Sequence, residues 1–206
     1  MSDIPKGRKL PEYYDDPVDL FFLSYSEKLN PYFKQLGFTP NGITTVSFIF
    51  GLITVWLYYK QQYILSGLSY IVSYFFDVMD GNFARTYKMT SQFGEIYDHV
   101  SDWIVIISLA YLFITNKQFG KQGRFIKLGL FMLLIILLII ALYHYSCQDK
   151  YYEEHRNESD DNTKTSMPLP KCFDHNHMSY TRYFGTGISA TFMGLIIISH
   201  VFLCNK

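Results

Sequence analysis

The acidic residues of this 206-residue chain are unevenly spread, and one group of them could do chemistry. Between residues 37 and 146 there are five acids, and all fall within 26 consecutive positions: Asp77, Asp80, Glu95, Asp98 and Asp102. Hard oxygen ligands in that number suit Mg²⁺, Mn²⁺ or Ca²⁺. Two such ions about 3.5 to 4 Å apart can clamp a phosphate during in-line displacement, so the cluster indicates phosphoryl-type transfer.

Helical spacing would bring these acids together. Two sets of residues each share a helix face, namely Asp77, Asp80, Gly81 and Ala84 on one helix and Gly94, Asp98 and Asp102 on the next. With a short turn joining the helices as an antiparallel pair, four aspartates face one gap. The small residues would leave room for a bulky ligand, and Arg85 adds a guanidinium suited to phosphate. Alternatively, the small residues only let two membrane helices pack closely.

The elements that position the cluster are apolar stretches long enough to cross a bilayer core, which takes roughly 20 helical residues. Residues 43–59, 128–146 and 183–204 carry no Asp, Glu, Lys or Arg, while residues 62–84 and 94–115 are similarly apolar but contain the aspartates. A carboxylate at membrane depth is costly unless paired or coordinated, so its presence suggests function. We predict an all-α, multi-pass transmembrane helical bundle of about five spans.

The first 38 residues are predicted to form an N-terminal arm with a juxtamembrane amphipathic helix at the membrane surface. Asp16 and Pro17 have the character of an N-cap and a first helical position. Apolar Val18, Phe22, Tyr25 and Leu29 then alternate at helical spacing with polar Asp19, Ser26, Glu27 and Lys28. Asn30-Pro31 is expected to end the helix, and a solvated, disordered arm is the alternative. No signal peptide is evident, so we expect these residues in the mature protein.

Residues 39–206 are predicted to be a single membrane domain that contains a polar loop at 147–182. The loop holds a glycosylation sequon at Asn157, expected to be unused. The Cys and His residues in and just before the loop could bind zinc, and the alternatives are ordinary surface residues or a disulfide. A cytoplasmic N-terminus would place twelve of the 18 Lys and Arg residues on the cytoplasmic side, as the positive-inside rule favours.

The stretch FDVMDGNFARTYKMTSQFGEIYDHVSD reads as D-x2-D-G-x2-A-R-x8-G-x3-D-x3-D. This pattern resembles the signature of the CDP-alcohol phosphotransferases, and every defining position matches. TPNGIT, from Thr39 to Thr44, is similar to the segment that enters the first transmembrane helix of that family. The resemblance covers residues 17–146. Such enzymes usually have six spans, one more than the five predicted here. The resemblance therefore leaves one wall of the acceptor site without a counterpart in this chain, and a homodimer partner is one way to supply it.

The resemblance implies roles for individual residues. Asp77, Asp80, Asp98 and Asp102 would hold two divalent cations, Mg²⁺ or Mn²⁺, and Asp102 would also be the base that takes the proton of the acceptor hydroxyl. The CDP donor would contact Gly81, Ala84, Arg85, Gly94 and Asn41. An N-cap role is the alternative for Asn41. His99 and Glu95 lie outside the minimal signature and are auxiliary candidates.

The function implied by this resemblance is metal-dependent transfer of a substituted phosphate from a CDP-linked donor, CDP-diacylglycerol or a CDP-aminoalcohol, to an alcohol acceptor. CMP would be released, and phospholipid biosynthesis is the expected setting. Membrane lipids are expected partners and nucleic acids are not. The membrane would be the endoplasmic reticulum or another cytoplasm-facing membrane in a eukaryote, or the inner membrane in a bacterium. The alternatives are a non-catalytic membrane protein that retains a divalent-cation site, and a channel or transporter using buried aspartates.

Overall fold

The structure is a computed structural model that describes residues 4–115, 121–155 and 171–204, in which all regular elements are helices. Six long helices form the bundle: α1 (Pro17–Gln35), α2 (Pro40–Tyr59), α3 (Tyr63–Thr86), α4 (Gln92–Thr115), α5 (Lys121–His155) and α7 (Thr186–Cys204). Before α7 come three short pieces, η1 (His175–His177), α6 (Met178–Thr181) and η2 (Arg182–Phe184). The predicted all-α class is confirmed.

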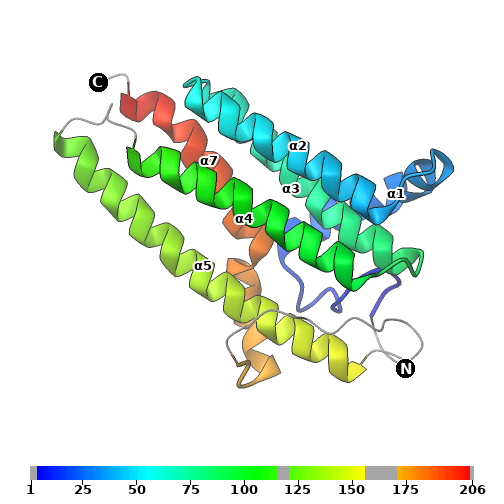
Figure 1. Cartoon of the computed structure of the whole chain (residues 1–206). Helices are drawn as coiled ribbons and strands as arrows, with labels where there is room; N and C mark the ends of the chain where they lie inside the picture. The colour runs from blue at the N-terminus through cyan, green and yellow to red at the C-terminus, as the bar shows by residue number, and fades with distance from the viewer. Residues whose placement is uncertain (1–3, 116–120, 156–170, 205–206) are drawn as a thin grey trace.

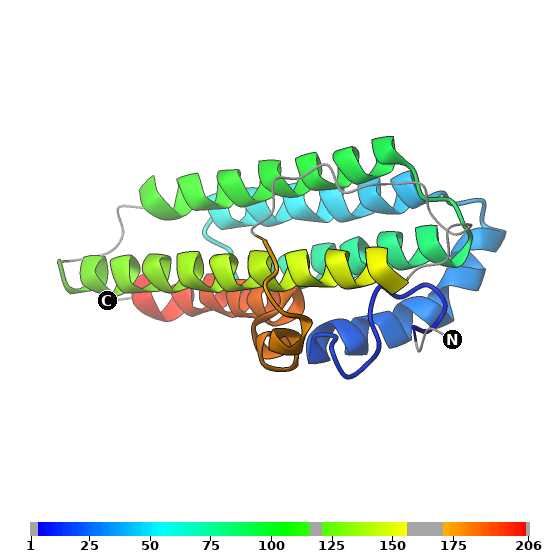
Figure 2. The same ribbon diagram turned by 90° about the horizontal axis from the view of Figure 1, so that it is seen from below.

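Helix α3 holds the centre of the bundle because it packs against α1, α2 and α7, whereas α4 packs on α2 and α5 on α7. The long helices run side by side, and α1 lies across one end (Figure 1). The turned view places the N-terminal segment and the far end of α7 at opposite ends of the bundle (Figure 2). The motif residues at the end of α3 and the start of α4 therefore share one end of the molecule with the N-terminal segment.

Four helical stretches are long and apolar enough to cross a membrane: Pro40–Tyr59, Gln92–Thr115, Leu128–Tyr152 and Met178–Val201. They correspond to four of the five predicted spans. The fifth, α3, is a 24-residue helix of similar length, but its serines, tyrosines and aspartates make it more polar. Its place among the other helices explains why that polarity is tolerated, since polar groups in membrane helices face the interior of the bundle.

Small and hydroxyl-bearing residues join α2 to α3. The Ser47 hydroxyl donates to the Ser73 carbonyl at 2.8 Å, and the Ser73 hydroxyl donates to the Ser47 carbonyl at 2.8 Å. Further along, the Ser66 hydroxyl donates to the Thr54 carbonyl at 2.9 Å. Such contacts let membrane helices approach closely and satisfy polar groups between them. These contacts fix the position of α3 along α2, and with it the position of the α3 aspartates.

Helix α1 begins as predicted, because the Asp16 carboxylate accepts a 2.7 Å hydrogen bond from the Val18 N–H. The assignment of its faces was wrong in part. Asp19 and Ser26, which were predicted to lie on the polar face, are buried. Both side chains have hydrogen-bond partners inside the protein. Asp19 accepts from the Tyr74 hydroxyl of α3 at 2.6 Å, and the Ser26 hydroxyl donates to the Phe22 carbonyl within α1.

The predicted break at Asn30-Pro31 was also wrong, since α1 continues to Gln35 with Pro31 inside it. A proline removes one helical hydrogen bond and crowds the preceding turn. Tertiary contacts outweigh that cost here. Leu29 and Phe33 on either side pack on the cluster around Met79 and Phe83, and the Asn30 amide donates to the Asn82 side chain at 2.6 Å.

Two buried aspartates tie α1 to the start of α7. Asp16 accepts from the Ile188 N–H at 3.0 Å, and Asp19 accepts from the Thr186 hydroxyl at 3.0 Å. Burial, with Asp16 nearby, raises the pKa of Asp19 above its usual range. A raised pKa lowers the cost of burial, because a neutral carboxyl group is far less costly to bury than a charged one.

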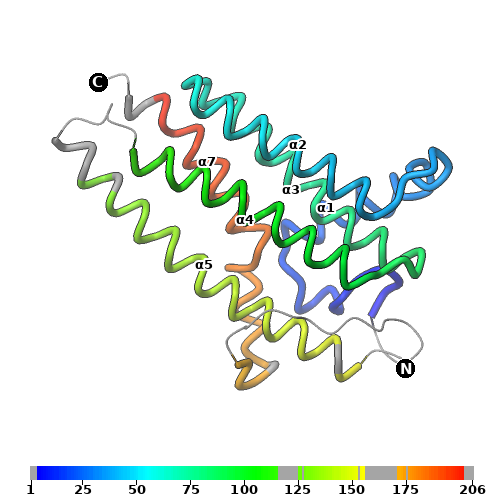
Figure 3. Tube along the Cα trace, in the orientation of Figure 1, coloured from blue at the N-terminus to red at the C-terminus, as the bar shows by residue number. Residues whose placement is uncertain are grey.

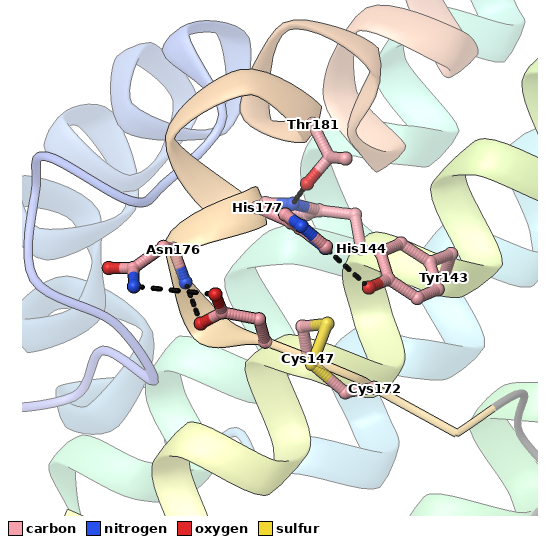
Figure 4. The surroundings of a disulfide bond; sticks show 8 residues. Tyr143, His144, Cys147, Cys172, Asn176, His177 and Thr181 are labelled. Atoms are coloured by element: carbon pink, nitrogen blue, oxygen red, sulfur yellow. Dashed lines mark hydrogen bonds between the residues drawn. A yellow bond between two sulfur atoms is a disulfide. The ribbon is translucent and has the colours of Figure 1, made fainter.

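The predicted loop at 147–182 is helical at its start, because α5 runs on to His155. Composition indicated a loop, but Lys, Glu and Gln are also good helix formers when a preceding helix is already in place. Cys147 and Cys172 form a disulfide that ties α5 to the segment before η1 (Figure 4). Of the alternatives for these cysteines, the structure has the disulfide. The sequon at Asn157 lies outside the described residues.

Candidate active site

Three carboxylates converge where the ends of α3 and α4 meet. Asp77 comes from α3, while Asp98 and Asp102 lie one turn apart on α4, and each offers an oxygen within 4.8 Å of the others. The i, i+4 spacing of the α4 pair explains their shared direction. Like charges this close repel one another, so the group favours a bound cation, and all-oxygen donors suit a hard divalent ion.

Asp80 departs from this arrangement. One of its carboxylate oxygens accepts a 2.5 Å hydrogen bond from the Thr44 hydroxyl of α2. Thr44 is itself buried and bonded to the Pro40 carbonyl. The structure thus brings three of the four motif aspartates together and holds the fourth at the edge of the group, against the first span.

The predicted donor residues surround one polar cavity of about 150 Å³. Its lining includes Asn41, Gly81, Ala84, Arg85 and Gly94, together with Asp80, Glu95, Asp98 and His99. These positions come from α2, α3 and α4, so the fold gathers residues that are far apart in the sequence. Asn41 is not an N-cap, since the Thr39 side chain caps α2 by accepting from the Gly42 N–H.

Two glycines make close approaches in this cavity. A Cβ added at Gly81 would lie 3.2 Å from the Arg85 Nη1, so the guanidinium lies over the glycine. A Cβ at Gly94 would lie 2.9 Å from the Asn41 Oδ1. Any larger residue at either position must displace a side chain that lines the cavity.

We expect Gly81→Leu to weaken CDP binding by about 10-fold or more, because the leucine would push the Arg85 guanidinium aside and fill the cavity; a tenfold change is 1.4 kcal/mol. Binding of divalent cations should survive, since Asp77, Asp98 and Asp102 are untouched. Gly129→Leu is the matched control, since a Cβ at Gly129 of α5 meets nothing within 4 Å. Calorimetry with CDP checks the difference, and equal affinities in the two variants would move the nucleotide site elsewhere.

His99 lies beside the aspartate group. Its Nδ1 is 3.8 Å from Asp98 Oδ2, and its buried Nε2 has no hydrogen-bond partner among the described residues. A buried, unbonded ring nitrogen next to the cavity is available to a ligand. Glu95, one turn earlier on α4, lines the same cavity.

Sequence reasoning missed several lining residues. Lys9 comes from the N-terminal segment, and Tyr145, Asp149 and Tyr152 come from α5. Lys9 belongs to no recognised motif. Thr44 lies in the TPNGIT segment, but the resemblance assigned no role to it. Asp149 and Tyr152 were hidden because their stretch was predicted to be a loop, whereas a helix that continues past Ser146 presents them at helical spacing.

A second cavity, of about 580 Å³, opens beside the first. Asp80, Gly81, Arg85, Asp98 and His99 line both. The second cavity continues between α3, α4, α5 and α7 along apolar side chains such as Leu109, Phe113, Phe131, Leu134 and Ile197, and it also reaches Asp77 and Asp102. The site therefore joins a polar chamber to an apolar one, with the acidic group at their junction.

Fold and site together define a membrane-embedded helical protein with a carboxylate centre next to a chamber lined largely by polar residues. The family model for CDP-alcohol phosphatidyltransferase matches residues 38–167. The match covers more than half of the chain, and the protein belongs to this family. The matched range contains α2, α3 and α4, which carry the motif residues.

Individual relatives are similar over shorter stretches. The archaetidylinositol phosphate synthase of Pyrococcus horikoshii is 32% identical over 85 residues, or 41% of this chain and 45% of that protein. A CDP-diacylglycerol–inositol 3-phosphatidyltransferase of Drosophila melanogaster is 30% identical over 80 residues, 37% of this chain and 35% of its own. A CDP-diacylglycerol–serine O-phosphatidyltransferase of Helicobacter pylori is 26% identical over 134 residues, 64% of this chain and 52% of its own. The chain thus spans about half or less of each, and no solved structure matches it.

Proposed function

We propose that the protein is a CDP-alcohol phosphotransferase of phospholipid synthesis, which moves a substituted phosphate from a CDP-linked donor to an alcohol and releases CMP. The observation that carries the proposal is that Asp98, which forms one group with Asp77 and Asp102, also lines the cavity that holds Gly81, Ala84, Arg85 and Gly94. Membership of the family supports the same reaction.

The three carboxylates, with Asp80 at their edge, fit divalent cations, and we propose two Mg²⁺ or Mn²⁺ ions there. Such ions neutralise phosphate charge and align the attacking and leaving oxygens. Asn41, Gly81, Ala84, Arg85 and Gly94 would hold the CDP part of the donor. Asp102 would accept the proton of the acceptor hydroxyl. As it does so, the oxygen of that hydroxyl would bond to phosphorus, and the bond between phosphorus and the CMP oxygen would break.

The donor we propose is CDP-diacylglycerol. The larger cavity offers apolar walls beside the acidic group, which suit the acyl chains of a lipid substrate. The names of the Drosophila and Helicobacter relatives also specify this donor. Their acceptors differ, inositol in one and serine in the other, so the acceptor is left to experiment.

Donor competition tests this choice. Purified protein should release CMP from CDP-diacylglycerol in the presence of a mixture of inositol, serine and diacylglycerol, the last being the acceptor that an aminoalcohol donor would need, and unlabelled CDP-choline or CDP-ethanolamine should compete poorly. The measurement is radiolabelled CMP by chromatography. Preferential use of CDP-choline or CDP-ethanolamine would overturn the lipid donor while leaving the reaction class in place.

The alternative from the sequence, a non-catalytic protein with a cation site, accounts for the three converging carboxylates. It gives no reason for a cavity that gathers Asn41, Gly81, Ala84, Arg85 and Gly94 from three helices. We therefore favour the enzyme. CMP release distinguishes the two.

We propose an integral membrane protein whose motif end faces the cytoplasm, on the basis of the Lys and Arg bias. The Cys147–Cys172 disulfide lies in the segment assigned to that side, yet disulfides are rare in the cytosol. The orientation therefore predicts that both cysteines are thiols in intact cells. A gel-shift assay with a maleimide reagent after rapid acid quenching checks this, and a pair that stays oxidised in cells would place this end in an oxidising compartment.

A further inference from the structure

The N-terminal segment, residues 4–16, lies against the end of the bundle that carries the candidate active site. The Gly7 carbonyl accepts hydrogen bonds of 3.0 Å from both the Asn82 amide and the Arg85 Nε of α3. The tube view shows this blue segment between the end of α3 and α5 (Figure 3). Gly7 has φ +83°, a conformation that favours glycine, and a Cβ there would meet Thr86 and Asn82.

A second set of contacts fixes the segment further along. Leu10 is fully buried in a cluster with Cys147, Cys172 and Met178. The Arg8 Nε donates to Glu27 at 2.8 Å, which ties the segment to α1. The segment is thus held on both sides of Lys9, which fixes the position of the Lys9 side chain.

The Lys9 side chain lies in the wall shared by the two cavities, since Lys9 lines both. Its Nζ donates to Asp149 Oδ1 at 2.9 Å and to the Tyr145 hydroxyl at 3.2 Å. Burial opposes its charge, but Tyr145 and Asp149 hold the pKa of Lys9 above its usual range. Lys9 is therefore a cation at physiological pH.

The chemistry of an ammonium group indicates what Lys9 could bind. An ammonium has three N–H donors, and the contacts with Asp149 and Tyr145 use two of them. The Arg85 guanidinium, whose Nε is turned to Gly7, lines the same two cavities. Two cations from different parts of the chain thus border a chamber whose other wall carries Asp80 and Asp98. An anionic group with several oxygens suits the cationic wall, and the divalent cations proposed above would lie between it and the acidic wall.

We propose that Lys9 is a phosphate-binding residue of this site, which contacts the diphosphate of the CDP donor from the N-terminal segment. The inference rests on the proposed function and adds to it a residue outside the motif and outside the matched range of the family model. The anionic ligand supplies the oxygen, and the third Lys9 N–H donates to it. Charge-assisted contacts of this kind contribute more than neutral ones.

The test is calorimetric CDP binding by the full chain in detergent with Mg²⁺ present. Lys9→Gln should weaken CDP binding by about 10-fold or more, in line with a hydrogen bond between charged groups. Lys6→Gln, an exposed lysine of the same segment, is the matched control and should bind CDP as the unmodified protein does.

A purely structural role for Lys9 makes a different prediction. Lys9→Gln leaves the buried Asp149 without its lysine, and adding Asp149→Asn removes that charge. If Lys9 binds phosphate, the double variant still binds CDP weakly; restored affinity in the double variant would overturn the proposal. Unchanged affinity in Lys9→Gln, while the unmodified protein and Lys6→Gln bind CDP, would overturn it as well and leave the proposed function standing. Failure of the unmodified protein to bind CDP would overturn both.

Discussion

Asp98→Asn is expected to lower the transfer rate by more than about 100-fold, because removing even an outer partner of a metal ligand typically costs 10- to 100-fold. Asp98 is one of the three residues whose oxygens lie within 4.8 Å of one another. An amide supplies a neutral oxygen in place of a charged one, so divalent cations should bind more weakly. Asp77→Asn should behave in the same way, since it removes the α3 member of the group.

The matched control is Glu154→Gln, which neutralises an exposed acid near the end of α5. All three variants should insert into membranes normally, because insertion depends on the apolar spans and not on the acids. CMP release and membrane content measured on the same preparations check both points. A near-normal rate in Asp98→Asn or Asp77→Asn would contradict the assignment of these residues as metal ligands.

Asp102→Asn is expected to separate binding from catalysis. The asparagine can still offer an oxygen to a cation, but it cannot accept the proton of the acceptor hydroxyl. Loss of a positioned base typically costs about 10²-fold or more in rate. CDP affinity should change little, because Asp102 lines the larger cavity and not the polar one that holds the predicted nucleotide residues.

The measurement pairs CDP calorimetry with CMP release on the same sample of Asp102→Asn. If affinity and rate fall together, Asp102 acts mainly as a ligand. The base would then have to be His99 or Glu95, and His99→Gln would be the next variant to measure, because its Nε2 is the ring nitrogen without a partner among the described residues.

The helices were largely predictable because membrane spans can be identified in a sequence by their length and their lack of charged residues. The stretches at 43–59, 94–115 and 128–146 lie within helices of the structure, and α7 covers residues 186–204 of the predicted stretch 183–204. Helix ends were less predictable where packing outweighs local preference. Pro31 stays inside α1 because the residues around it are held by α3, and no property of the Asn30-Pro31 pair itself reveals that.

The site was predictable where spacing fixed direction. Asp98 and Asp102 share a face of α4 for any regular helix, and their meeting with Asp77 required only that α3 and α4 turn back on each other. The position of Asp80 depended on Thr44 of a third helix, which helical spacing cannot show. Lys9 depended on the path of the N-terminal segment, which Gly7 and Leu10 set through contacts with residues more than seventy positions away.

The faces of α1 illustrate the same limit. A periodicity argument assigns Asp19 and Ser26 to water because they are polar. In the folded chain Asp19 finds hydroxyl partners on α3 and α7, and burial follows from those partners. Polar residues that are satisfied by tertiary hydrogen bonds cannot be distinguished from solvated ones by sequence pattern alone.

The most direct test of the proposed reaction is CMP release by the purified protein from CDP-diacylglycerol, with inositol and serine offered as acceptors, before and after chelation. The three converging carboxylates lead us to expect CMP formation that stops in chelator and returns when Mg²⁺ or Mn²⁺ is added. Full-rate CMP formation in chelator would contradict a metal-dependent CDP-alcohol phosphotransferase. So would the absence of CMP from every CDP-linked donor across a panel of alcohol acceptors with Mg²⁺ or Mn²⁺ present.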